Sequence, residues 1–199
     1  MVQKIAITGG IGSGKSCVLE EIKKHGYEGF SCDEIYKEVI RQKEYVEKIK
    51  DVFPSVVKNG KDGEGIDRKE LSRIVFQDEG ALKQLNEIAH PLIMSALERK
   101  MNAAQGEYVF AEVPLLFEGN YQDIFDRVIV VLRDKKLRIE AIVRRDGVET
   151  REAELRIERQ FDYEKNAVAL SKRYFIFENN YGIDELKKWV DEWIKAVCK

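Results

Sequence analysis

Residues 9–16 read Gly-Gly-Ile-Gly-Ser-Gly-Lys-Ser and constrain the fold more than any other stretch of the chain. They fit the pattern G-x-x-x-x-G-K-[S/T], which binds phosphate where it joins a strand to a helix. The apolar run 5–7 precedes this loop, and Val18, Leu19 and Ile22 follow it at helical spacing. The pattern therefore lies between a predicted strand and a predicted helix, which disfavours the alternative of a glycine-rich turn without a ligand.

The residue types of this loop suit a nucleoside triphosphate. Glycines let the backbone turn its N–H groups toward an anion, and the following helix directs the positive end of its dipole to the same point. Lys15 is long enough to reach the β- and γ-phosphates, and the Ser16 hydroxyl is a ligand for Mg²⁺. The loop thus predicts ATP and Mg²⁺ as cofactors. The predicted nucleotide contacts here are Ile11, Gly12, Ser13, Gly14, Lys15, Ser16 and Cys17.

Composition limits the partners and the compartment. A chain of 199 residues with 44% hydrophobic residues predicts one domain with a sizeable core. The net charge of −2 argues against a nucleic-acid partner, and no apolar run is long enough to span a membrane. Three cysteines far apart and a start without a signal peptide favour reduced thiols in the cytoplasm. We expect a monomer or a weak homo-oligomer.

Strands and helices are expected to alternate along the chain, which predicts an α/β fold. After the first strand at 5–7, the expected strands cover residues 27–32, 108–113, 127–132 and 174–177. This order predicts a three-layer kinase fold of the phosphate-loop class, with a mostly parallel five-stranded sheet and helices on both faces.

The expected single domain of residues 1–199 has three parts. The core is expected at about 1–32, 106–135 and 163–199, a helical acceptor-binding region at 33–105, and a helical lid at 136–162. Within the inserted region we expect a broken helix from Asp33 to about residue 52, a polar loop at 58–65, and a helix capped by Asp67. A long helical stretch follows at 79–104, with a kink or break at Pro91.

Two carboxylates are candidates for the chemistry. In an open parallel sheet, ligands bind beyond the carboxyl ends of the strands, and Asp33 and Glu112 lie at two such ends. Phosphoryl transfer needs a carboxylate that accepts the proton of the acceptor hydroxyl. Asp33 is the first choice for this general base, and a plain helix cap is the alternative.

Five arginines within sixteen residues form the second candidate cluster: Arg144, Arg145, Arg151, Arg156 and Arg159. Guanidinium groups suit phosphate oxygens, and a helical segment that carries them is able to close over a nucleotide as a lid. Interleaved glutamates favour a solvated face for Arg151 and Arg159. Arg145 and Arg156 are the predicted lid residues.

These motifs together resemble the dephospho-CoA kinase family. Residues 8–16 are similar to the opening of that family, and Asp33 matches the last residue of its Asp-Ala-Asp motif. The remaining matches are His90-Pro91-Leu92-Ile93, Val113-Pro114-Leu115-Leu116-Phe117-Glu118, Arg145-Asp146-Gly147, Arg156-Ile157-x-x-Gln160 and Asn179.

The resemblance implies ATP-dependent phosphorylation of the ribose 3′-hydroxyl of dephospho-CoA, the last step of coenzyme A synthesis. It implies catalytic roles for Asp33, Lys15 and Arg145, and nucleotide contacts from Arg156 and Asn179. It also implies acceptor contacts from Thr8, Asp33, His90, Glu112, Leu115 and Phe117. Another nucleoside or nucleotide kinase is the alternative enzyme, and a GTPase-like switch is disfavoured because the chain contains no Asn-Lys-x-Asp.

The chain departs from the family pattern at several positions. Ser31 and Cys32 replace the first two residues of the Asp-Ala-Asp motif, while Asp33 is retained. Where the family often has an arginine four residues before Arg145, this chain has Ala141. Arg138 or Arg144 is therefore a candidate to supply the missing cation.

Overall fold

The computed structural model describes residues 2–60 and 63–198. The chain divides into two compact units: a core unit of residues 1–31 and 101–199, and an inserted unit of residues 32–100. Among the described residues, none of the helices combines the length and the apolar character that a membrane span requires.

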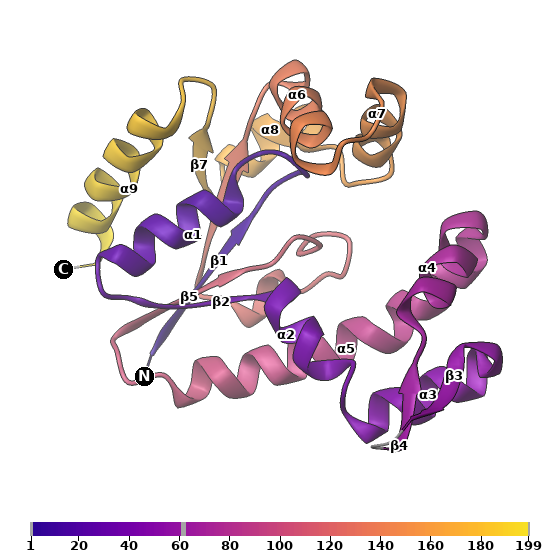
Figure 1. Cartoon of the computed structure of the whole chain (residues 1–199). Helices are drawn as coiled ribbons and strands as arrows, with labels where there is room; N and C mark the ends of the chain where they lie inside the picture. The colour runs from indigo at the N-terminus through magenta and orange to yellow at the C-terminus, as the bar shows by residue number, and fades with distance from the viewer. Residues whose placement is uncertain (1, 61–62, 199) are drawn as a thin grey trace. The chain divides into compact units, whose positions relative to one another are not determined.

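The core unit contains a parallel sheet that confirms the predicted fold class. Described strands pair in the order β2-β5-β1-β6-β7, with every neighbouring pair parallel (Figure 1). Their bounds are β1 (Gln3–Thr8), β2 (Glu28–Ser31), β5 (Tyr108–Glu112), β6 (Arg127–Leu132) and β7 (Phe175–Glu178). Each lies within two residues of the strand predicted from sequence at both ends.

Helices cover both faces of this sheet. Ile129 and Val131 of β6 belong to a hydrophobic cluster that also includes residues of α1 (Lys15–Lys24) and α9 (Ile183–Val197), and these two helices lie side by side in Figure 1. Val128 and Val130 alternate to the other face and are equally buried. α8 packs against β6 and β7, which explains why β6 is apolar along its length.

The last helix behaves as its sequence predicts. Trp193 is 7% exposed and Trp189 stacks on Phe177 at 4.5 Å between ring centroids, so both indoles face the sheet. Three further core helices follow β6: α6 (Lys135–Asp146), α7 (Thr150–Glu158) and α8 (Tyr163–Ser171). A 3₁₀ turn, η2 (Gln122–Ile124), precedes β6.

Two details of this region differ from expectation. The sequence analysis assigned no element to α8, whose buried residues Tyr163 and Leu170 are too few to reveal a helical period. The sequence also suggests Thr150 as the cap of a lid helix, but Thr150 is the first residue of α7 and Glu149 is the N-cap, without a side-chain hydrogen bond.

The inserted unit is mainly helical. Its helices are α2 (Cys32–Val39), α3 (Lys43–Val52), α4 (Arg68–Gln77) and the greater part of α5 (Glu79–Ala103), with a 3₁₀ turn η1 (Pro54–Val56). The predicted cap of α4 is confirmed, because the Asp67 carboxylate accepts from the backbone N–H groups of Lys69 and Glu70.

Three expectations for this unit are wrong. The stretch 58–65 is not a plain loop, since β3 (Val57–Gly60) and β4 (Gly63–Ile66) form an antiparallel pair whose polar, glycine-rich composition hides it. Asp33 is not the cap of α2, because the helix already begins at Cys32 and Asp33 lies in its first turn. The predicted break at Pro91 is wrong because α5 continues through this residue, while the alternative of a kink there stays a prediction.

Candidate active site

The phosphate loop, residues 9–16, is fixed by hydrogen bonds to its carbonyl oxygens, one from Lys15 of the loop itself and three from side chains outside it. Four consecutive carbonyls accept hydrogen bonds from side chains. The pairs are Gly10 O with Lys15 Nζ (3.1 Å), Ile11 O with Arg138 Nε (2.9 Å), Gly12 O with Arg133 Nη1 (3.1 Å) and Ser13 O with Asn179 Nδ2 (2.8 Å). With the carbonyls engaged in this way, the N–H groups at the start of α1 remain for an anion, because they have no carbonyl partner within the helix.

The loop also contains a buried polar atom that a phosphate fits. Ser13 is 1% exposed, and its Oγ has no hydrogen-bond partner among the residues that the structure describes. Lys15 is 7% exposed and lies in the first turn of α1, at the positive end of the helix. A buried donor and a buried cation at one helix N-terminus make a site that suits a triphosphate.

Gly14 is the N-cap of α1 and cannot carry a side chain. Its φ is +102°, in the region that L residues rarely adopt, and an added Cβ would lie 2.3 Å from Asn179 Nδ2. Asn179 is 7% exposed, and its Nδ2 donates to Ser13 O. The added Cβ would therefore displace the amide that makes this hydrogen bond to the loop.

We therefore expect Gly14→Ala to weaken ATP binding and to lower stability by about 1–3 kcal/mol. Gly26→Ala is the matched control, because Gly26 has φ +87° but nothing lies within 4 Å of an added Cβ. The control carries backbone strain without the collision, and it should lose stability while its ATP affinity, measured by calorimetry, is kept. Equal ATP affinities in the two variants would contradict the assigned role of Gly14.

Ser16 and Glu112 meet at the carboxyl ends of the strands. Glu112 pairs with Ile7 of β1 and Ser31 of β2 in the sheet register, and it is 6% exposed. The Ser16 hydroxyl donates to Glu112 Oε1 at 2.9 Å. This direction keeps the lone pairs of Ser16 Oγ available for a cation, so the donor set fits Mg²⁺. Within 2–60 and 63–198, no cluster of three or more His, Cys, Asp or Glu residues suits a metal, so most ligands would be phosphate oxygens and waters.

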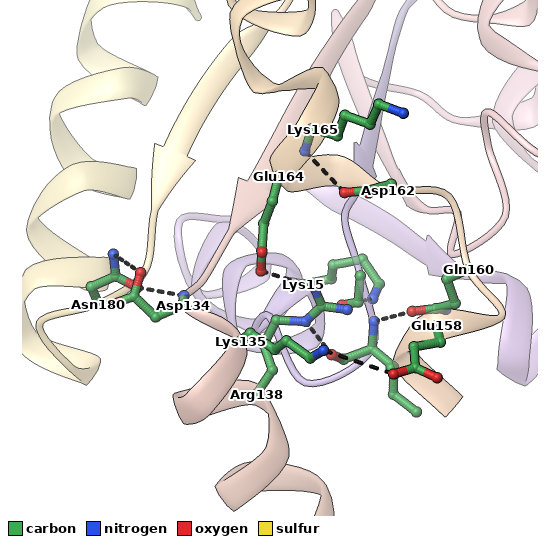
Figure 2. Close-up of polar contacts among 12 residues, drawn as sticks. Lys15, Asp134, Lys135, Arg138, Glu158, Gln160, Asp162, Glu164, Lys165 and Asn180 are labelled. Atoms are coloured by element: carbon green, nitrogen blue, oxygen red, sulfur yellow. Dashed lines mark hydrogen bonds and ion pairs between the residues drawn. The ribbon is translucent and has the colours of Figure 1, made fainter. Parts of the chain in front are cut away.

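The segment after α7 contacts the loop from the other side. Gln160 Oε1 accepts from the backbone N–H of Ile11 at 2.6 Å, and the Tyr163 hydroxyl lies 3.1 Å from Thr8 Oγ1 (Figure 2 shows Gln160). Burial raises the pKa of Tyr163, so this phenol stays protonated. Thr8 is fully buried in this contact, and its assignment to the acceptor stays a prediction.

Phe117 belongs to an aromatic cluster beneath the same segment. Its ring lies 5.1, 5.9 and 5.5 Å from the rings of Phe161, Tyr163 and Tyr174. The cluster anchors the segment that carries Gln160 to the end of β5. Phe117 and its half-buried neighbour Leu115 are therefore at least partly structural, and their predicted contact with the acceptor stays a prediction.

A pocket of about 340 Å³ lies beside the phosphate loop. Its lining includes Gly10, Ser13, Arg133, Lys135, Arg138 and Asn180. Sequence reasoning missed Arg133 and Asn180, although each follows the carboxyl end of a strand by one or two residues. Applying the strand-end rule to β6 and β7 as well as to β2 and β5 would have found both.

The two predicted lid arginines, Arg145 and Arg156, share the carboxylate of Asp146 as a partner. Arg145 Nε and Arg156 Nη1 each donate to the Asp146 carboxylate at 2.7 Å, and Arg156 Nη2 donates to Glu152 Oε1 at 2.6 Å. The pKa of Asp146 is lowered, first by its hydrogen bond with Arg145. The structure thus joins these two arginines at the turn between α6 and α7, and their contact with a nucleotide stays a prediction.

Two further predicted residues lie in the inserted unit. Asp33 is exposed in the first turn of α2, where a carboxylate is favourable at the helix N-terminus, and His90 lies within α5. Cys17 is exposed on α1 of the core unit, next to Ser16.

A family model described as dephospho-CoA kinase matches residues 3–185. The chain is similar to a dephospho-CoA kinase of Fusobacterium nucleatum, with 31% identity over 195 residues that cover 97% of each chain. Two solved structures are similar as well. One is from Thermus thermophilus, with a TM-score of 0.80, 28% identity and 98% of each chain covered. The other is a dephospho-CoA kinase from Campylobacter jejuni, with a TM-score of 0.69, 27% identity, and 99% of this chain and 98% of that chain covered.

Proposed function

The chain belongs to the dephospho-CoA kinase family, and we propose that it transfers the γ-phosphoryl group of ATP to the ribose 3′-hydroxyl of dephospho-CoA. The products are CoA and ADP, and the reaction is the final step of coenzyme A biosynthesis. The match over residues 3–185 carries this proposal, because it spans the phosphate loop and the whole inserted unit. The hydrogen bonds to the loop carbonyls support phosphoryl transfer, because they leave the N–H groups at the start of α1 for the phosphates of ATP.

The core unit would bind the nucleotide. The N–H groups at the start of α1 and the Lys15 ammonium would hold the phosphates, and Asn179 would keep the loop in shape through Ser13 O. Mg²⁺ supplies charge neutralisation on the phosphates when it is bound, with the Ser16 hydroxyl as its protein ligand and Glu112 orienting that hydroxyl. Arg145 and Arg156 would join the phosphates from the lid, at residues 136–162, once released from Asp146.

The acceptor would be held by residues from the inserted region, at 33–105, and from the end of β5. Asp33 is the proposed general base, since a carboxylate in hydrogen-bond reach of the 3′-hydroxyl both orients it and accepts its proton. The proposed acceptor contacts are His90, Glu112, Leu115, Phe117 and Thr8.

A coupled ADP-release assay tests the proposal. The protein is supplied with ATP, Mg²⁺ and dephospho-CoA, and separately with adenosine, AMP or CMP as acceptor. We expect turnover with dephospho-CoA and none above background with the other three. Turnover only with a nucleoside or nucleotide would support ATP binding at the phosphate loop but contradict dephospho-CoA as the acceptor. Absence of transfer to all four acceptors would contradict the kinase assignment.

A further inference from the structure

Arg138 is a buried cation that lies against the phosphate loop. It is 4% exposed, and its Nε donates to Ile11 O at 2.9 Å (Figure 2). An added Cβ on Gly10 would lie 2.2 Å from Arg138 Nη2, so the guanidinium occupies the space that the missing side chain leaves open. Arg138 also lines the pocket of about 340 Å³ beside the loop.

The charge of Arg138 is poorly compensated by protein groups. Its ion-pair partner among the described residues, Glu164 Oε1, lies 3.8 Å from Nη1, and Glu164 is itself 54% exposed. Among the described residues no carboxylate reaches hydrogen-bond distance of this guanidinium, although a guanidinium carries five N–H donors. Burial lowers the pKa of Arg138, while the neighbouring Glu164 raises it.

The less buried arginines of the same region show the opposite arrangement. Arg145 and Arg156 are more accessible, yet each makes a charge-assisted bond of 2.7 Å to Asp146. A buried cation without a close anion is costly, whereas an exposed one needs none. Because no carboxylate of the described residues lies at hydrogen-bond distance from Arg138, we expect an anion from outside the chain to pair with its guanidinium.

The pocket gives this anion a position. The lining includes Arg133, Lys135 and Arg138 together with the loop residues Gly10 and Ser13. Acidic residues also line it, namely Asp134, Glu164 and Glu178, and the Asp134 carboxylate is engaged by Asn180 Nδ2 at 3.3 Å. Since Glu164 is the carboxylate that contacts Arg138, it is the group that an arriving phosphate would displace.

We propose that Arg138 binds the phosphates of the nucleotide and that Glu164 is the counter-ion it exchanges for them. The inference rests on the proposed function, in which ATP occupies this loop. Arg138 has two tasks in this scheme: its Nε fixes the Ile11 carbonyl, and its Nη groups reach the anion. Glu164 lies 3.8 Å from the guanidinium and competes with ATP for it.

The first test measures ATP binding in the presence of Mg²⁺ and without acceptor, by isothermal titration calorimetry. Arg138→Met keeps an unbranched apolar side chain but removes the charge and every N–H donor, including the bond to Ile11 O, and we expect ATP affinity to fall about 10- to 100-fold. Arg138→Lys keeps a charge but loses the planar donor set, and an intermediate loss is expected. Arg144→Met, on the exposed part of the same helix, is the comparison and should bind ATP as the wild type does.

The second test concerns the counter-ion. Glu164→Gln removes the competing carboxylate, so ATP should bind about two- to fivefold more tightly. Glu185→Gln is the matched control, because Glu185 lies in the first turn of α9 as Glu164 does in α8. In an Arg138→Met background the effect of Glu164→Gln should shrink, which is the coupling expected of two groups that interact directly.

Each outcome decides the inference. Wild-type ATP affinity in a folded Arg138→Met protein, or a loss that appears with Arg144→Met instead, would overturn the role of Arg138. If Arg138→Met does not fold, wild-type affinity in Arg138→Lys is the overturning result. Weaker ATP binding in Glu164→Gln would show that Glu164 positions the arginine and does not compete. The wild type is assayed for dephospho-CoA phosphorylation in the same series, so a failure of the proposed function is seen separately.

Discussion

Replacing Lys15 by methionine is expected to lower kcat/KM about 10²- to 10³-fold, because the ammonium offsets charge that develops on the transferring phosphoryl group. Lys15 is 7% exposed, and its Nζ lies 3.1 Å from Gly10 O at the start of α1. Methionine fills a similar volume without the charge. Steady-state kinetics with ATP and dephospho-CoA measure the loss, and we expect most of it in kcat.

Stability should not follow activity in this variant. A cation in the first turn of a helix opposes the helix dipole, and burial adds a desolvation cost. Removing the charge of Lys15 relieves these costs but also removes its hydrogen bond to Gly10 O, so the thermal unfolding midpoint should change little. Lys24→Met is the control, since Lys24 is exposed in the last turn of the same helix and should keep full activity. A lower unfolding midpoint together with near-normal kcat would contradict the assigned role of Lys15.

The sequence was sufficient for the phosphate loop because its information is local. Eight consecutive residues, an apolar run before them and a helical period after them specify β1, the loop and α1 without any distant contact. The same holds for β6 and for α9, whose apolar composition and helical spacing agree with the observed burial. These segments were predicted because local preference and tertiary environment agree.

The surroundings of the loop were not predictable in the same way. Arg138, Gln160 and Tyr163 reach the loop from 127, 149 and 155 positions along the chain. No periodicity or spacing in a single sequence specifies such pairs. Arg138 was one of two candidates from the sequence, and burial at 4% against an exposed Arg144 is what separates them.

The missed elements are short or weakly patterned. In β3 and β4, Val57 and Ile66 are paired at the ends, and the residues between them are polar or glycine. α8 buries few residues against β6 and β7, and its alanine and valine residues do not outline one face. In both cases contacts with neighbouring strands decide the structure, and propensity alone does not.

Asp33→Asn is expected to lower kcat about a hundredfold or more and to leave ATP affinity close to that of the wild type. The amide keeps the size of the side chain and its ability to orient a hydroxyl, but it does not accept a proton. The expected loss is therefore in the chemical step. Single-turnover kinetics with dephospho-CoA, together with calorimetric ATP binding, separate this loss from weaker substrate binding.

Glu34→Gln is the matched control for this prediction. Asp33 and Glu34 are neighbouring exposed carboxylates in the first turn of α2, so both substitutions remove one negative charge from the same helix end. Helix stability should change equally, and only Asp33→Asn should slow phosphoryl transfer. Equal kcat values in the two variants would sink the general-base assignment. Because Arg138→Met is expected to weaken ATP binding and Asp33→Asn to spare it, the pair also distinguishes nucleotide binding from proton transfer.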